Sequence, residues 1–294
     1  MADVVRQAAK RLARAKLTYG HGTSNADDEA AFLVHESLGM SPEGLARAWT
    51  KKVSAARIAK IEALIDARIA TRKPAPYLVG AAYIQGFRFA VDERVIVPRS
   101  FIGELLFAPH VVGPEASFIR APRKIKRVLD LCTGSGCLAI LAAKVFRNAQ
   151  VDAVDLSKDA LAVAKQNVAA HNLGRRVTLH HGDLFAPLKG RRYDLILTNP
   201  PYVDAPAMKK LPPEYRAEPT LALAGGRDGL DLVRRILLEA ERHLTPHGAL
   251  ICEVGRGREA LERAFPRLPF FWLDTAESTG EVFWLTAQDL RALA

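Results

Sequence analysis

The chain has 294 residues, of which 49% are hydrophobic and 25% are charged, a composition typical of a globular protein with a sizeable apolar core. No apolar run approaches the ~18 residues of a membrane-spanning helix, which excludes an integral helical membrane protein. The net charge is +10, with Lys and Arg spread through every segment. This charge favours polyanionic surroundings such as RNA or a ribosomal assembly, but it equally fits the solvated surface of a protein from a basic proteome.

The N-terminus and the cysteines bear on the compartment. Met1–Lys16 is a basic, Ala-rich helical pattern without the apolar core of a secretory signal. A mitochondrial transit peptide is the alternative, but Asp3 and the unbroken continuation into a helix favour a folded element. Cys132, Cys137 and Cys252 have neither a second pair nor nearby histidines, so no metal site is predicted. They are expected to be packing residues in a reducing compartment, which predicts a cytoplasmic protein.

The first part of the chain, residues 1–72, is expected to be a helical domain. Apolar side chains recur at helical spacing from the start of the chain. A second helix is expected after a cap at Ser24 or Asn25, and a third after a cap at Ser54. The helical pattern breaks at Lys73-Pro74-Ala75-Pro76, which predicts a domain boundary.

The next segment, residues 73–100, is expected to be a linker. Apolar residues alternate with period two between Tyr77 and Val97, and Asp92-Glu93-Arg94 separates two such runs. This pattern predicts a β-hairpin that turns at Asp92-Glu93-Arg94.

The remainder, residues 101–294, is expected to be a catalytic domain, because strand and helix patterns alternate in it. The expected strands are Val128–Leu131, Val151–Val154, Val177–His180, Tyr193–Thr198, Ala249–Val254, Phe270–Leu273 and Val282–Leu285. The expected helices are Leu138–Phe146, Lys158–His171, Leu230–Leu244 and Arg258–Phe265. Such alternation predicts an α/β fold with a doubly wound, mostly parallel seven-stranded sheet, and the adjacent last strands predict a hairpin at its edge.

A glycine-rich loop, Asp130-Leu131-Cys132-Thr133-Gly134-Ser135-Gly136-Cys137, follows the first of these strands and opens a helix. Gly134, Gly136 and Ala139 also match a dinucleotide fingerprint, which alone is a weak signal. The Asp130 carboxylate would repel a pyrophosphate but attract the ammonium of a methionine moiety. Electrostatics therefore favours S-adenosylmethionine over NAD as the cofactor.

Two further carboxylates follow successive strands, at the edge where ligands of such sheets bind. Asp155 is expected to accept the ribose hydroxyls, and Asp183 the adenine amino group, with Leu184 against the ring. Each carboxylate has the alternative of a helix cap or turn residue. The complete expected cofactor set is Asp130, Thr133, Gly134, Ser135, Gly136, Asp155, Leu156, Asp183, Leu184 and Asn199.

The tetrapeptide Asn199-Pro200-Pro201-Tyr202 ends an apolar strand at a rigid corner, because neither proline can donate to the ladder. Asn199 Oδ1 and the Pro200 carbonyl can accept both hydrogens of a planar –NH₂ group, and Tyr202 can cover its flat face. Asn199, Pro200 and Tyr202 are therefore the expected catalytic residues, and together with Pro201 they are expected to bind the substrate. The alternative is a strand-ending turn with a buried tyrosine.

With these motifs the chain resembles the protein-glutamine N(5)-methyltransferase family of class I S-adenosylmethionine-dependent methyltransferases. The resemblance covers nearly the whole chain and implies an N-terminal helical domain, a hairpin linker and a catalytic domain with Asn-Pro-Pro-Tyr after the fourth strand. Further matching segments are Glu93–Ser100, Leu211–Tyr215, Glu218-Pro219, Ala222-Leu223, Gly225–Leu230 and Glu253-Val254-Gly255.

One bacterial branch of this family methylates the Gly-Gly-Gln glutamine of translation release factors, and the other a glutamine of large-subunit ribosomal protein L-three. The chain is more similar to the second branch in Tyr19–Thr23 with Asn25-Ala26, in its cysteine-bearing loop and in Pro98–Ile102. Phe101 departs from the proline common in that branch. The resemblance implies a ribosomal protein substrate, either free or within a large-subunit precursor close to rRNA, and no membrane partner.

Other functions are kept as alternatives. These are a release-factor glutamine methyltransferase, a nucleic-acid methyltransferase acting on an exocyclic adenine or guanine amine, and a non-enzymatic RNA-binding assembly factor. Arg99 is expected either near the cofactor carboxylate or substrate backbone, or in a surface salt bridge. His21, His180 and His181 show no ligand spacing and are expected to be caps or surface residues.

Overall fold

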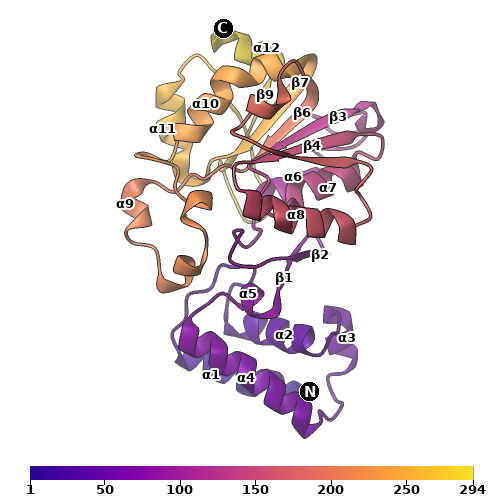
Figure 1. Cartoon of the computed structure of the whole chain (residues 1–294), viewed down its shortest axis with the longest axis vertical. Helices are drawn as coiled ribbons and strands as arrows, with labels where there is room; N and C mark the ends of the chain where they lie inside the picture. Colours follow the sequence, from indigo (N-terminus) through magenta and orange to yellow (C-terminus); the bar gives the residue numbers. More distant parts are fainter. Residues whose placement is uncertain (294) are drawn as a thin grey trace.

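The computed structural model describes residues 1–293, which form a helical part at the N-terminus and a larger α/β part, joined by a small hairpin (Figure 1). The helical part contains α1 (Ala2–Arg14), α2 (Ala26–Ser37), α3 (Pro42–Arg47), α4 (Ala55–Thr71) and α5 (Ala75–Val79). Leu12, Leu33, Ile61 and Ile65 are buried where α1, α2 and α4 pack together, which is the pattern that the apolar spacing predicts.

The N-terminal boundaries differ in detail from those expected. Asn25, not Ser24, caps α2 by accepting a hydrogen bond from the Asp28 N–H at 2.9 Å. The helix expected after Ser54 is α4, and α3 and α5 were not predicted. The segment around Pro76 was interpreted as a break, but a proline in the first turn of a helix removes no hydrogen bond, and α5 forms there.

The linker contains a hairpin of β1 (Ala81–Ile84) and β2 (Phe87–Ala90), paired antiparallel. Its turn is Gln85-Gly86, with φ of 51° and 75°. The expected turn at Asp92-Glu93-Arg94 does form, with the Val95 N–H donating to the Asp92 carbonyl at 3.1 Å, but the expectation that it joins the paired strands is wrong. Left-handed φ at both central residues gives the twist that a two-residue hairpin needs. Val95 and Val97 lie beyond the hairpin and pack in a small apolar cluster with Ala160 and Val163 instead of pairing in a strand.

The larger part is built on a seven-stranded sheet in the order β5-β4-β3-β6-β7-β9-β8. Its strands are β3 (Arg127–Leu131), β4 (Gln150–Asp155), β5 (Val177–His181), β6 (Tyr193–Thr198), β7 (Leu244–Glu253), β8 (Phe271–Leu273) and β9 (Val282–Thr286). The first five run parallel, whereas β9 is antiparallel to both β7 and β8. The predicted mostly parallel sheet with an edge hairpin is confirmed.

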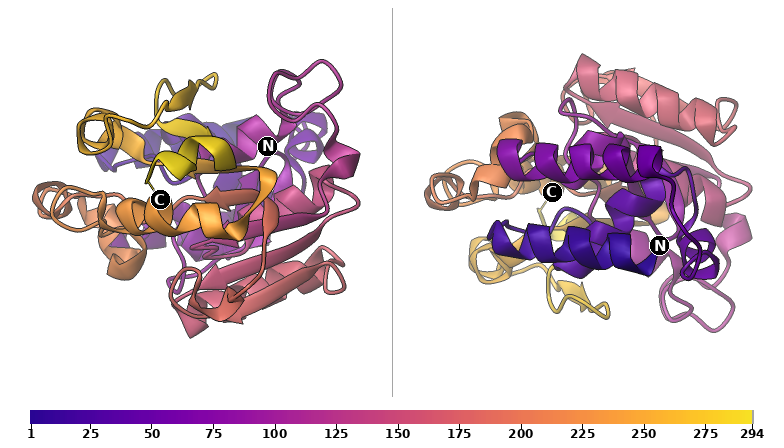
Figure 2. Two further views of the ribbon diagram at one scale, coloured as in Figure 1. Left: turned by 90° about the horizontal axis from the view of Figure 1, so that it is seen from above. Right: turned by 90° about the horizontal axis from the view of Figure 1, so that it is seen from below.

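Helices cover both faces of this sheet (Figures 1 and 2). One face carries α6 (Phe101–Phe107), α7 (Cys137–Val145) and α8 (Lys158–Ala170), and the other carries α10 (Asp231–Ala240), α11 (Arg258–Ala264) and α12 (Ala287–Leu290). A long excursion after β6 contains α9 (Ala205–Met208) and the 3₁₀ turn η3 (Pro213–Ala217). Within residues 1–293, no helix combines the length and the apolar character needed to cross a membrane.

Candidate active site

The candidate site lies where the chain changes direction across the sheet. After β3 the chain continues to β4 and β5 on one side, and it then crosses to β6 on the other side of β3. The loops after β3 and β6 therefore leave the same edge from neighbouring strands, the position where ligands of such folds bind. The Thr198 hydroxyl joins the two strand ends by donating to the Leu131 carbonyl at 3.1 Å.

The loop after β3 is a tight left-handed turn. Cys132, Gly134 and Gly136 have φ of 57°, 53° and 79°, and Gly136 is the N-cap of α7. A Cβ on Gly136 would lie 3.1 Å from the Ala164 Cβ, so glycine lets α7 pack closely on α8. Asp155 fixes the loop by accepting the Gly134 N–H at 2.8 Å, while its other oxygen accepts the Ser157 N–H at 2.8 Å.

Asp130 is fully buried and has one oxygen free for a ligand. Its Oδ2 accepts hydrogen bonds from the Thr133 hydroxyl and, at 3.0 Å, from the Ala139 N–H. Its Oδ1 is buried without a hydrogen-bond partner among residues 1–293. Burial raises the pKa of Asp130 to about 7, although these two hydrogen bonds act in the opposite direction. A cation placed at Oδ1 would restore the ionised form.

The other expected cofactor residues have different surroundings. Asp183 is exposed and forms an ion pair with Arg235 at 2.7 Å, and Leu156 is 51% exposed. Leu184 is buried in the apolar core beneath α10, with a φ of 46°. The structure thus brings the loop after Asp130 into contact with Asp155, whereas the side chains of Asp183 and Leu156 are exposed to solvent.

Three glycines enclose the tetrapeptide after β6. A Cβ on Gly225 would lie 2.7 Å from the Tyr202 Cα, and one on Gly229 would lie 2.3 Å from the Tyr202 carbonyl oxygen. A Cβ on Gly255 would lie 2.7 Å from the Tyr202 ring. These distances exclude any side chain, so the glycines of the Gly225–Gly229 stretch allow the returning chain to press against the tetrapeptide and fix its conformation.

Glu253 lies behind the Tyr202 ring. Its Oε2 accepts from the Ser100 hydroxyl at 2.7 Å and from the Phe101 N–H at 3.0 Å, and the Tyr202 hydroxyl lies 3.5 Å from its Oε1. Burial raises the pKa of Glu253 to about 7 and also raises the pKa of Tyr202. At neutral pH the Tyr202 hydroxyl is therefore protonated and can donate to the carboxylate form of Glu253.

All four residues of the tetrapeptide line a cavity of about 1200 Å³ between the helical and α/β parts. The helical part contributes lining residues from the loop before α2 and from α2 itself, and the hairpin and the start of α6 contribute others. The carboxylate residues among them are Asp28, Glu104, Asp204, Glu253, Glu277 and Glu281. Only Arg99 and Arg256 carry guanidinium groups among the lining residues that the structure describes. This cavity is called the acidic cleft below.

Arg99 lines the cleft and forms a salt bridge, but its partner is buried and not on the surface. It forms a two-pronged ion pair with Glu218, with Nη1–Oε1 and Nη2–Oε2 distances of 2.6 and 2.7 Å, and the Glu218 side chain is fully buried. Burial alone would raise the pKa of Glu218, but Arg99 and His21 lower it to about 2. Removal of either partner of such a pair leaves a buried charge, which is costly.

The histidine expectations are partly wrong. His21 is buried, 1% exposed, with its ring 4.4 Å from the Tyr215 ring and its Nε2 3.6 Å from Glu218 Oε2. It is therefore an interior residue, because Tyr215 and Glu218, which are distant in sequence, pack against it. His180 contacts Asp152 at 2.7 Å, and His181 Nε2 lies 3.0 Å from the Leu156 carbonyl oxygen.

Sequence reasoning did not assign roles to the buried carboxylates Glu214, Glu218 and Glu253, of which Glu253 lines the cleft. The sequence feature that could have indicated a role is their position next to prolines and glycines, inside the segments that resemble the glutamine methyltransferase family. Charged residues near turns are usually exposed, so their burial follows only from long-range packing.

The sheet order, the glycine loop at the end of β3 and the Asn-Pro-Pro-Tyr corner at the end of β6 define a class I methyltransferase. Residues 117–211 match the family model of the methyltransferase small domain, and residues 3–80 match that of the PrmC N-terminal domain. A methyltransferase from Pyrococcus furiosus of known structure is 18% identical, with a TM-score of 0.49 over 69% of this chain and 90% of that one.

Two curated relatives are much more similar in sequence. The ribosomal protein uL3 glutamine methyltransferase of Bradyrhizobium diazoefficiens is 59% identical over 289 residues, which are 98% of this chain and 91% of the relative. The protein of the same name from Burkholderia pseudomallei is 49% identical over 302 residues, 99% of this chain and 96% of the relative. The chain therefore belongs to the family of ribosomal protein uL3 glutamine methyltransferases. It is an S-adenosylmethionine-dependent enzyme.

Proposed function

We propose that the chain transfers a methyl group from S-adenosylmethionine to the side-chain amide nitrogen of a glutamine in ribosomal protein uL3, the large-subunit protein L-three. One observation carries the proposal: the Asn199–Tyr202 corner faces an acidic cleft between two domains, directly beside the loop that suits the methyl donor. The division into a substrate-recognition domain of residues 1–72, a linker of residues 73–100 and a catalytic domain is part of this proposal.

The loop after β3 fits the cofactor. Asp130 Oδ1, buried without a partner among the described residues, would hold the cofactor ammonium, and Gly134, with nothing within 4 Å of the position of a Cβ, leaves the backbone open to it. Thr133 and Ser135 shape this turn, since Thr133 donates to Asp130 and the Ser135 carbonyl accepts from Asn167 at 2.9 Å. When bound, the cofactor supplies an electrophilic methyl group on a sulfonium.

The adenosine part of the cofactor is assigned to the residues at the ends of β4 and β5. Each carboxylate oxygen of Asp155 accepts one backbone N–H and can accept a second hydrogen bond, so Asp155 can accept the ribose hydroxyls. Leu156 is exposed beside it and can cover the adenine. Asp183 would have to share its carboxylate between Arg235 and the adenine amino group, and Leu184 would support that loop from the core.

The tetrapeptide performs the positioning. A glutamine amide is a poor nucleophile, because its nitrogen lone pair is delocalised into the carbonyl. Asn199 Oδ1 and the Pro200 carbonyl would hold its two N–H bonds, Pro201 would keep the corner rigid and Tyr202 would cover the amide plane. Positive charge that develops on the nitrogen strengthens these hydrogen bonds, so they stabilise the transition state more than the bound substrate. After methyl transfer the nitrogen is strongly acidic and loses one of its protons, so no side-chain base is required.

The charge of the cleft favours a basic polypeptide as substrate. Its lining has six carboxylate residues against two arginines, although the whole chain carries +10. Phosphate groups of a nucleic acid would be repelled from such a surface, whereas Lys and Arg side chains around a target glutamine would be attracted. This argues against the exocyclic-amine alternative, and it supplies the acidic surface that a basic ribosomal protein needs.

The basic charge elsewhere on the chain supports action on uL3 within a large-subunit precursor, near rRNA. A cytoplasmic location is part of the same proposal. The test is labelled-methyl transfer from S-adenosylmethionine to purified uL3, a translation release factor and rRNA in parallel, followed by mass mapping of the product. Methylation of a uL3 glutamine alone is expected. Preferential labelling of the release factor or of rRNA would overturn the substrate assignment.

A further inference from the structure

The excursion after β6 connects the tetrapeptide physically with the helical domain. It begins after Tyr202 and ends at Gly225, before α10, and two backbone hydrogen bonds close its base. The Val203 N–H donates to the Leu223 carbonyl and the Gly225 N–H donates to the Val203 carbonyl, both at 2.9 Å. Because Gly225 also touches Tyr202, the base of this loop rests on the catalytic corner.

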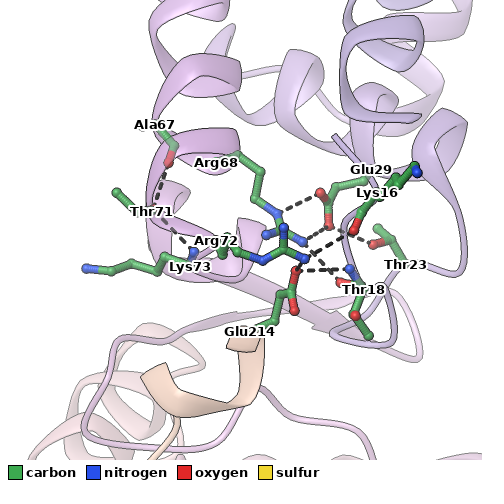
Figure 3. A network of polar contacts seen from close by, with 10 residues as sticks. All are labelled: Lys16, Thr18, Thr23, Glu29, Ala67, Arg68, Thr71, Arg72, Lys73 and Glu214. Carbon is green, nitrogen blue, oxygen red and sulfur yellow. Dashed lines mark hydrogen bonds and ion pairs between the residues drawn. The ribbon is translucent and has the colours of Figure 1, made fainter. Parts of the chain in front are cut away.

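At the far end of the same loop, the Glu214 side chain reaches into the helical domain (Figure 3). Glu214, fully buried, accepts the Thr18 N–H at 3.0 Å and pairs with Arg72 at 2.6 Å. Thr18 lies between α1 and α2, and Arg72 ends α4 with a left-handed φ of 57°. One carboxylate of the catalytic domain therefore joins two separate segments of the helical domain.

A second buried network inside the helical domain holds those partners in place. Arg68, 0% exposed, pairs with buried Glu29 at 2.8 Å and also donates to the Thr18 carbonyl at 3.2 Å. Thr18 thus donates to Glu214 through its N–H and accepts from Arg68 through its carbonyl (Figure 3). Arg72 in addition donates to the Lys16 carbonyl at 3.1 Å.

Four residues after Glu214, Glu218 makes the corresponding contacts to the linker. It accepts the Val97 N–H at 2.9 Å and both prongs of Arg99, and His21 of the helical domain lies 3.6 Å away. Tyr215, between the two glutamates, packs against His21 and lines the acidic cleft. The carboxylates at 214 and 218 therefore tie one short segment to the helical domain and to the linker.

We propose that residues 211–218 are a clasp that sets the position of the helical domain over the catalytic corner, with Glu214 and Glu218 as positioning residues for methyl transfer to a protein. This role rests on the proposed function. A protein substrate that touches both domains needs their spacing to be fixed before its glutamine can reach Asn199. A short peptide that occupies only the corner does not need this spacing, and neither does the cofactor, whose proposed loop lies within the α/β part.

The kinetic test uses Glu214→Gln and Arg72→Met, which remove the ion pair from either side. Arg72 is partly exposed, so Arg72→Met serves as the second variant if Glu214→Gln fails to fold. The control is Asp152→Asn, which removes a partly buried ion pair with Arg191 inside the catalytic domain. Substrates are full-length uL3 and a short synthetic peptide around the acceptor glutamine, and S-adenosylmethionine affinity is measured on each sample.

Both clasp variants are expected to raise KM for full-length uL3 on the order of tenfold, with kcat/KM for the peptide and cofactor affinity unchanged. The control is expected to leave the ratio of the two substrates unchanged. Equal losses on both substrates, or no loss on uL3, would overturn the clasp.

A measurement without substrate separates the clasp from the proposed function. Hydrogen exchange at the Thr18 amide and across residues 203–225 is expected to speed up in Glu214→Gln, while α7 keeps its protection. Unchanged protection of Thr18 would contradict the clasp even if uL3 is methylated. A wild-type chain that fails to methylate uL3 would reject the proposed function and leave the exchange result to decide on the clasp.

Discussion

The Thr198 hydroxyl donates a hydrogen bond to the Leu131 carbonyl at 3.1 Å, across the ends of two neighbouring parallel strands. Asn199 follows the first residue directly, and the glycine loop follows the second. This bond therefore connects the group that we propose to hold the acceptor amide with the loop that we propose to hold the methyl donor. The distance between nucleophile and methyl group depends on how rigidly these strand ends are joined.

Replacement Thr198→Val should lower both kcat and the free energy of unfolding. It keeps the shape of the side chain but leaves the buried Leu131 carbonyl without its side-chain partner, a loss of about 1–3 kcal/mol. We expect kcat to fall by about tenfold, because misplacement of the reacting atoms lowers the rate steeply. Steady-state kinetics and urea unfolding measure the two effects. The matched control is Thr178→Val on the exposed side of β5, and equal kcat values for the two variants would contradict the prediction.

Cofactor affinity should depend on pH through Asp130. Burial raises the pKa of this carboxyl to about 7 in the free protein, and only the ionised form attracts the cofactor ammonium. Affinity measured by calorimetry should therefore increase as the pH rises through about 7. Asp130→Asn should bind S-adenosylmethionine at least tenfold more weakly and lose this increase. Asp66→Asn, in an exposed ion pair of the helical domain, should behave as wild type. A variant Asp130→Asn that keeps the wild-type pH profile would exclude this role.

Acid should weaken the junction between the domains through Glu218. Its pKa is lowered to about 2 in the folded chain, against about 4.3 for an unfolded glutamate. The stabilisation is therefore fully present above about pH 4.3 and is lost as the pH falls through about 2, and it amounts to about 3 kcal/mol. Urea unfolding at neutral pH should show this loss in Glu218→Gln, and the difference from wild type should shrink with acid. A difference that stays constant down to pH 2 would contradict the assignment.

The acidic cleft should determine affinity for the protein substrate. Glu277→Lys with Glu281→Lys reverses two charges on its lining, so KM for uL3 should rise and become less dependent on salt. An effect of about tenfold is expected if each reversal costs under 1 kcal/mol. Glu259→Lys, on α11 and 88% exposed, is the control outside the cleft. If all three substitutions raise KM equally, net charge and not the cleft is responsible.

Local patterns predicted most of the catalytic domain. The seven strands, their edge hairpin and the corner at Asn199 follow from apolar periodicity and from proline and glycine chemistry, which act within a few residues. The chain turns at both Asp92-Glu93-Arg94 and Gln85-Gly86, and the local pattern does not distinguish which of the two turns joins paired strands. The chain does turn at Gly86, where a left-handed φ of 75° costs little.

The residues that join the domains could not be predicted in this way. Glu214 meets Thr18 across 196 positions of sequence, and Glu218 meets Arg99 across 119. Nothing local distinguishes these glutamates from exposed ones, because their burial depends on the folded positions of both domains. The same holds for the acidic cleft, whose carboxylates come from segments as distant as Asp28 and Glu281.

The most direct test of the account is kcat for uL3 glutamine methylation by Asn199→Ala, with S-adenosylmethionine affinity measured on the same sample. Loss of one acceptor that stabilises the transition state should reduce kcat by about 10²–10³-fold. Cofactor affinity should stay close to that of wild type, because Asp130 and its loop remain intact. A variant Asn199→Ala with near-normal turnover would contradict the assignment of the Asn-Pro-Pro-Tyr corner as the place where the glutamine amide is held.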